Sequence, residues 1–200
     1  WKNNLLWITE ETKPKPRDWV YAINKAKVEE FYFSKVEQLK DKKIKLINFR
    51  MCTAVGPSYY KKGGVVAALA KSPLGLLIDG KDTLLQFIHE DDVKNIVELA
   101  IKNKEIEGTF NLASDSFSPT KELNKNKIFL KTPKLLFKSI ISLLWHLRII
   151  NVSPTSLNLM SHGIIVSPKK LMQTFNYHFK YSTKQAYDHA VRERIKKGTL

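Results

Sequence analysis

The first half of the chain alternates between helix-like and strand-like segments, and this order restricts the fold more than any other feature. Apolar residues recur at helical spacing over residues 18–39, with Asp18 as a plausible N-cap, and a short buried strand follows at 44–49. A second helix is predicted over 93–103 and a second strand over 108–114. This order is typical of a doubly wound α/β fold with parallel strands.

The insert and the second half differ in pattern from these two units. A short helix is expected at 63–72, and residues 75–89 read as a strand, an Asp-Gly turn and a second strand. Residues 133–150 form an apolar amphipathic pattern with basic flanks. Two further helices are expected at 167–175 and 182–197, each opened by a serine.

Tyr21 and Lys25 are the first candidates for chemistry. At i and i+4 they share one face of the predicted helix. An ammonium beside a phenol favours the phenolate, so a tyrosine in this setting can exchange a proton with a hydroxyl or carbonyl group. Such a site needs a hydride carrier, because alcohol–carbonyl exchange also moves a hydride. By itself the pair is a weak signal, because such pairs arise by chance in many helices, and it favours a surface lysine beside a half-buried tyrosine.

Four segments, in order, carry a resemblance to a known family. The quoted stretches are "TEETKPKPRDWVYAINKAKVEEF" (9–31), "INFRMCTAVGP" (47–57), "LLQFIHEDDVKNIVELAIKN" (84–103) and "GTFNLAS" (108–114). Together they resemble the extended short-chain dehydrogenases/reductases, the NAD-dependent epimerase/dehydratase family. Besides Tyr21 and Lys25, the matching positions are Glu29, Arg50, Gly56, Pro57, Phe87, His89 and Asp92.

The resemblance implies the C-terminal part of a Rossmann-like doubly wound parallel sheet plus a small, mostly helical substrate lobe. Residues 1–57 and 86–114 would belong to the NAD(P)-binding domain. Residues 58–85 and 115–200 would form the substrate-binding lobe. The implied activity is an NAD(P)-dependent oxidoreductase or epimerase that transfers a hydride at a carbinol carbon.

The resemblance also implies a role for individual residues. Tyr21 would be the general acid/base, and Lys25 would hold the nicotinamide ribose of NAD or NADP. The backbone around Met51 and Cys52 would lie along the nicotinamide ring, at the strand end where ligands sit in such sheets. The positions expected to contact substrate are Thr53 and Gln86.

The sequence departs from the family pattern in several places. No Gly-x-x-Gly-x-x-Gly fingerprint for a dinucleotide occurs in the chain, so we expect a fragment that lacks the nucleotide-binding half and is inactive alone. Leu85 stands where many nucleotide-sugar enzymes have an arginine that meets the diphosphate, and Thr53 replaces a common asparagine. The substrate stays open as a small sugar-, sterol- or polyol-like molecule.

Composition narrows the partners. The formal charge is +15, but 29 of the 34 basic residues are lysines spread along the chain, so nucleic acid is not an expected partner. Cys52 is the single cysteine, which favours a reducing, cytoplasmic compartment. The five histidines form no metal-ligand pattern. His89 is expected to order the loop before a helix capped by Asp91 or Asp92.

Residues 133–150 allow several interpretations. The broad apolar face with lysines around it fits a membrane-surface helix, a lid over the substrate or a homodimer contact. A core helix of the small lobe is the favoured prediction. The alternative to an enzyme is a non-catalytic scaffold that keeps the fold and is held at a membrane surface through this helix.

Overall fold

The computed structural model describes residues 6–17, 19–58, 69–150, 154–156, 158 and 161–198. In chain order, the helices and strands are α1 (Val20–Ser34), α2 (Val36–Asp41), β1 (Ile47–Met51), β2 (Thr53–Val55), β3 (Leu74–Ile78), β4 (Leu84–Leu85), β5 (Phe87–His89), α4 (Glu90–Lys102), β6 (Gly108–Leu112), β7 (Ser118–Pro119), α5 (Thr120–Leu123), β8 (Ile128–Thr132), α6 (Lys134–His146), the 3-10 turn η1 (Pro154–Ser156), α8 (Lys169–Phe175) and α9 (Thr183–Lys196).

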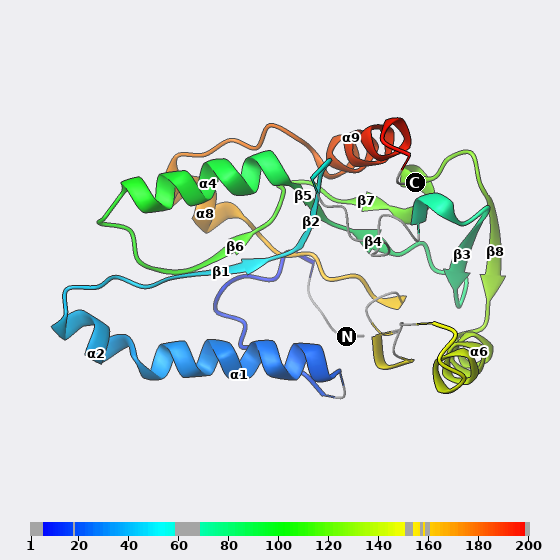
Figure 1. Cartoon of the computed structure of the whole chain (residues 1–200), viewed down its shortest axis with the longest axis horizontal. Coiled ribbons are helices and arrows are strands. Elements are labelled where there is room, and N and C mark those ends of the chain that lie inside the picture. The colour runs from blue at the N-terminus through cyan, green and yellow to red at the C-terminus, as the bar shows by residue number, and fades with distance from the viewer. Residues whose placement is uncertain are drawn as a thin grey trace.

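Strand pairing is mostly parallel. β1 pairs with β6, β2 with β5 and β3 with β8 in parallel, and β4 with β7 is antiparallel. β1 and β2 follow one another with only Cys52 between them, so one extended stretch meets β6 first and then β5. Figure 1 shows α4 and α1 on opposite sides of the β1–β6 pair. Parallel strands with helices on both sides are the arrangement that the sequence predicted.

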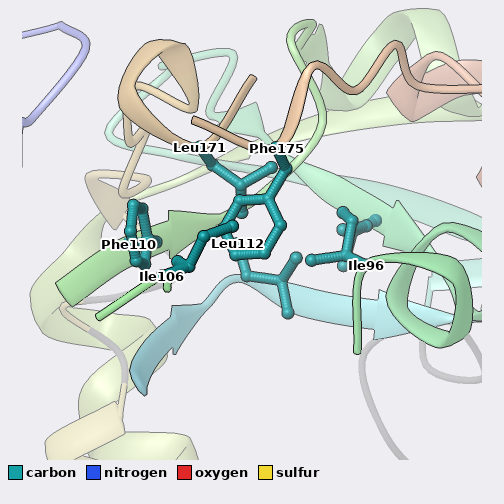
Figure 2. Close-up of a cluster of buried hydrophobic side chains, with 7 residues drawn as sticks. Ile96, Ile106, Phe110, Leu112, Leu171 and Phe175 are labelled. Carbon is teal, nitrogen blue, oxygen red and sulfur yellow. The ribbon is translucent and has the colours of Figure 1, made fainter. Parts of the chain in front are cut away.

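The main hydrophobic cluster lies between α4, β6 and α8. Figure 2 shows its side chains converging from these elements. The buried members are Ile88, Ile96, Ile106, Phe110, Leu112, Leu171 and Phe175. Phe110 and Phe175 meet edge to face with ring centroids 5.2 Å apart, a favourable aromatic geometry. Helix α8 therefore packs directly on the sheet.

A second cluster joins the C-terminal helix α9 to β2 and β5. Its buried members are Val55, Phe87, Leu123, Ala186, Tyr187 and Ala190. Ser182 caps α9 through a capping box with Gln185, as its sequence predicted. The domain division at residues 57, 85 and 114 stays a prediction. The last two helices of the predicted lobe, α8 and α9, contact the strands β6 and β5 of the sheet.

The strand, turn and strand predicted at 75–89 form, but the strands do not make a hairpin. The turn itself exists, with positive φ at Asp79 and Gly80. Its flanking strands do not pair with each other, because three more residues separate the turn from β4 and each strand has another partner. Instead, Asp79 Oδ1 accepts a hydrogen bond of 2.8 Å from the backbone N–H of Lys134, which joins the turn to the start of α6.

Two predicted helices differ in detail from the structure, and a third lies mostly outside the described residues. The helix predicted at 18–39 breaks at Lys35 into α1 and α2, and α1 buries no residue. Asp18 and most of the helix predicted at 63–72 lie outside the described residues. Helix α6 forms where predicted, but none of its residues is buried, so the prediction of a core helix is wrong. No described helix is long and apolar enough to cross a membrane.

His89, not Asp91 or Asp92, caps helix α4. Its Nδ1 accepts a hydrogen bond of 3.1 Å from the backbone N–H of Asp91. Asp92 is instead fully buried in the first turn, where it accepts hydrogen bonds from the Tyr177 hydroxyl (2.6 Å) and the Lys180 N–H (2.9 Å). The acidic group therefore holds the chain segment between α8 and α9 against α4.

His89 also bonds to helix α9. Since its Nδ1 is an acceptor, the neutral ring carries its proton on Nε2, which lies 2.8 Å from Nδ1 of His189. Tyr181 stacks on the His89 ring with centroids 3.9 Å apart. Burial lowers the pKa of His89 below its ordinary value, although the charge of Asp91 opposes this shift. The folded state thus favours a neutral imidazole.

This arrangement predicts a loss of stability in mild acid. Because the unfolded chain holds a proton on His89 more readily than the folded chain, the free energy of unfolding should fall as the pH drops below about 6.5. His89→Asn keeps a capping side chain but has no imidazole, so its urea midpoint should change less than the wild-type midpoint between pH 7.5 and 5.5. The exposed His178→Asn serves as control and should follow the wild type. Equal pH dependence in all three proteins would contradict the prediction.

Candidate functional site

Helix α1 brings Tyr21 and Lys25 together as predicted from their spacing. The Lys25 Nζ lies 5.7 Å from the centroid of the Tyr21 ring. Trp19 packs against the tyrosine, with its ring centroid 5.0 Å from that of Tyr21. Tyr21 is 57% exposed, and no hydrogen bond or ion pair joins Tyr21 or Lys25 to another described residue. Both polar groups are available to a ligand.

Arg50 at the end of β1 fixes helix α1 to the sheet. Its Nη2 and Nε donate to the two oxygens of Glu29, at 2.6 and 3.1 Å. The two side chains are 21% and 16% exposed. Burial alone would raise the pKa of Glu29, but the hydrogen bonds and charge of Arg50 outweigh it, and the pKa lies below its ordinary value. Glu29 is two helical turns beyond Tyr21, so this bidentate pair sets where α1 presents its tyrosine.

The same guanidinium holds the segment before α1. Arg50 Nη1 donates to the carbonyl oxygens of Glu10 (2.8 Å) and Thr12 (3.1 Å). Asn111 on β6 continues this line, because its backbone N–H donates to the Glu10 carboxylate and its side-chain amide donates to the Ile8 carbonyl. The N-terminal loop, α1, β1 and β6 are therefore connected through two polar side chains.

The three residues predicted at the strand end lie at the junction of the two strands: Met51 ends β1, Cys52 lies between the strands and Thr53 begins β2. Met51 and Thr53 are exposed, whereas Cys52 packs against the main hydrophobic cluster. Burial raises the pKa of the Cys52 thiol to about 12, so little thiolate forms at neutral pH and a nucleophilic role is disfavoured. No described hydrogen bond or ring contact joins these three residues to Tyr21 or Lys25.

Gln86 occupies a different setting from the one its predicted role requires. It is 5% exposed, and its Nε2 donates to the backbone carbonyls of Ser114 (2.7 Å) and Val166 (2.9 Å). Its Oε1 accepts from the Val166 N–H. Both amide hydrogens are used within the protein, so Gln86 acts as a brace between segments. The neighbouring Leu85 packs against the second cluster and offers no charge to a phosphate.

The donor set of α1 fits one part of a dinucleotide. An exposed ammonium and an exposed phenol side by side can hydrogen-bond the hydroxyls of a ribose. Two surface hollows among the described residues lie elsewhere, one along α6 and the other beside the end of α9. Neither of these two hollows is lined by Tyr21 or Lys25, so neither is a dinucleotide-binding site beside this pair.

Two structural roles near the site were not predicted from the sequence: the bond between Glu29 and Arg50, and the contacts of Asn111 with the N-terminal loop. Glu29 and Arg50 were both recognised as matching positions, but the bond between them was not predicted. Nothing local connects residues 21 positions apart, and only the acid on a helix and the arginine at a strand end could have suggested the pair. The role of Asn111 carried no signal beyond its place in a strand.

Comparison with known proteins identifies the fold. No protein-family model matches the sequence, and no curated protein matches it. Solved structures do match. UDP-glucose 4-epimerase of Thermus thermophilus, in complex with NAD, aligns at 20% identity over 93% of this chain and 57% of that chain, with a TM-score of 0.64. RMD from Pseudomonas aeruginosa, complexed with NADPH, aligns at 15% identity over 95% and 60%, with a TM-score of 0.66.

A third similar structure is dTDP-glucose 4,6-dehydratase of Bacillus anthracis in complex with NAD. It aligns at 13% identity over 97% of this chain and 59% of that chain, with a TM-score of 0.65. The chain therefore spans about three-fifths of the length of these structures. It has the Rossmann-like α/β fold of the NAD-dependent epimerases and dehydratases, which confirms the fold class expected from the sequence.

The Arg50–Glu29 pair predicts a measurable stability difference. Glu29→Gln leaves a half-buried guanidinium without its charged partner, and the free energy of unfolding should fall by about 2 kcal/mol. Glu105→Gln is the matched control, because it removes the acid of the exposed Lys45–Glu105 ion pair and should change stability much less. Urea unfolding of both variants checks this. Equal losses would mean that Arg50 does not fix α1.

Proposed function

We propose that the full-length protein is an NAD(P)-dependent oxidoreductase or epimerase, with Tyr21 and Lys25 as its acid/base pair. The single observation that carries the proposal is the pairing of these two exposed side chains on α1, which make no hydrogen bond or ion pair with another described residue, on a helix that Arg50 holds to the strand end. The fold shared with NAD- and NADPH-bound epimerases and dehydratases supports it. The substrate is a small molecule with a carbinol or carbonyl group.

The residues act as follows. In the oxidation, the deprotonated Tyr21 oxygen accepts the proton from the carbinol oxygen. In the reverse reaction, the Tyr21 hydroxyl donates that proton to the carbonyl oxygen. The Lys25 ammonium, which lies over the Tyr21 ring, donates to the ribose hydroxyls. A nicotinamide cofactor, when bound, takes up the hydride that the carbinol carbon releases. Met51 and Thr53, exposed at the junction of β1 and β2, are the proposed contacts to the nicotinamide ring and to substrate, and the backbone of Cys52 contributes to the ring contact.

Leu85 limits the substrate class, because it has no charged group that could bind a diphosphate. A leucine that packs into the second cluster cannot donate to a diphosphate. The missing donor disfavours nucleotide sugars, so the proposed substrates are sugar-, sterol- or polyol-like small molecules. Each class is tested separately with NAD and with NADP.

Tyr21→Phe in the full-length protein tests the assignment. Loss of the acid/base group should lower turnover by about 10²- to 10⁴-fold, and it should weaken NADH binding much less, because Lys25 still donates to the ribose. Tyr32→Phe is the matched control, because Tyr32 is an exposed tyrosine on the same helix. Turnover is followed by nicotinamide absorbance and cofactor affinity by NADH fluorescence. Equal turnover of the two variants would overturn the role of Tyr21.

Lys25→Met tests the second residue of the pair. It should weaken NADH binding as well as turnover, because the ribose loses a charged donor. Lys27→Met, also exposed on α1, is its control. A full-length protein that binds neither NADH nor NADPH would favour the non-catalytic scaffold instead.

A further inference from the structure

Helix α6 carries two apolar stripes, and only one of them faces the protein. Phe137, Ile141 and Leu144 recur at helical spacing and are half-buried. The second stripe is exposed to solvent. Its members are Leu136 (55% exposed), Ile140 (46%), Leu143 (61%) and Leu147 (59%).

The exposed stripe is continuous. Spacings of four, three and four residues place its side chains in one row along the helix. Leu147, the C-cap, keeps a right-handed helical conformation and extends the row by one position. In Figure 1, α6 lies at the end of the molecule opposite α2, beside β3 and β8. Four large aliphatic groups in one exposed row are more than the scattered apolar residues of an ordinary surface.

The charge around α6 is one-sided. The 65 residues from Leu123 to Tyr187 contain no aspartate or glutamate, although the whole chain has 19 acidic residues. The basic residues of this segment are Lys125, Lys127, Lys131, Lys134, Lys138, Arg148, Lys169, Lys170, Lys180 and Lys184. Lys131, Lys134, Lys138 and Arg148 lie on α6 or directly beside it. The apolar row therefore lies in a stretch of sequence whose charged side chains are all cationic, and the carboxylate that bonds to the start of α6 comes from Asp79 outside this stretch.

We propose that α6 docks on the surface of an anionic lipid bilayer, with the row Leu136, Ile140, Leu143 and Leu147 inserted below the headgroups. The apolar row gains from leaving water, and the lysines of this acid-free segment are attracted to anionic lipid. With 13 residues, α6 is about 20 Å long, shorter than the roughly 30 Å hydrocarbon core, so it lies on the membrane and does not cross it.

Charge and size favour lipid over a second copy of the chain. Two copies facing each other through α6 would bring two acid-free cationic segments together. Four half-exposed side chains also fall far below the 20 to 30 residues a side, roughly, of a stable protein interface. A bilayer instead supplies the negative charge that this segment lacks.

Sedimentation of the full-length protein with vesicles tests the proposal. Vesicles contain phosphatidylcholine alone or with 30% phosphatidylserine, and no substrate or cofactor is present, so the outcome is independent of the proposed activity. We expect binding to the anionic vesicles and at least tenfold weaker binding to phosphatidylcholine. Leu136→Ser/Leu143→Ser should weaken anionic binding at least tenfold. Lys131→Gln/Lys138→Gln should weaken it about 25-fold, about fivefold for each lysine.

Val97→Ser/Ile101→Ser is the matched control, since both residues are exposed aliphatics one turn apart on α4. It should bind like the wild type, and circular dichroism verifies that every variant folds. Absent vesicle binding, or equal binding by the Leu136/Leu143 and Val97/Ile101 variants, would overturn the proposal. So would a dimer in size-exclusion chromatography that the Leu136/Leu143 variant alone abolishes, because the row would then be covered by a second copy.

Discussion

The arrangement of the candidate site depends on one guanidinium. Arg50 leaves the end of β1, binds both oxygens of Glu29 on α1 and donates to two carbonyls of the loop before α1. Helix α1 has no fully buried residue, so hydrophobic packing among the described elements can contribute only a part of what fixes its position. A planar fork that bonds a carboxylate bidentately fixes direction as well as distance. The contact between Arg50 and Glu29 therefore determines where Tyr21 and Lys25 lie relative to the sheet.

The rest of the molecule uses polar side chains in the same way, between elements that are distant in sequence. Asp92 holds the segment before α9, His89 meets His189, and Gln86 braces two backbone segments. Each is buried or nearly so, where an unpaired polar group is costly. The apolar clusters therefore supply the bulk of the stability, while these bonds determine which segments lie together.

Local patterns predicted much of this structure. The strand at β6, the helix at α4 and the approach of Tyr21 to Lys25 follow from periodicity and i, i+4 spacing, which act within a few residues. The partner of β3 could not be predicted, because β8 lies some 50 residues later and the Asp79–Gly80 turn indicated a neighbour instead. The cap of α4 was missed because an acidic residue at a helix start resembles a cap, whereas burial gave Asp92 other partners. Long-range pairing carries no local signature.

The setting of Cys52 has a consequence for handling and for oxidative conditions. It is the only cysteine, it packs against the main hydrophobic cluster, and its thiol remains protonated at neutral pH. Peroxide and disulfide reagents react with the thiolate form of cysteine, and little thiolate forms at Cys52 in the folded protein. Folded protein should therefore resist intermolecular cross-linking without added reductant, and the appearance of such cross-links would report on unfolded chains.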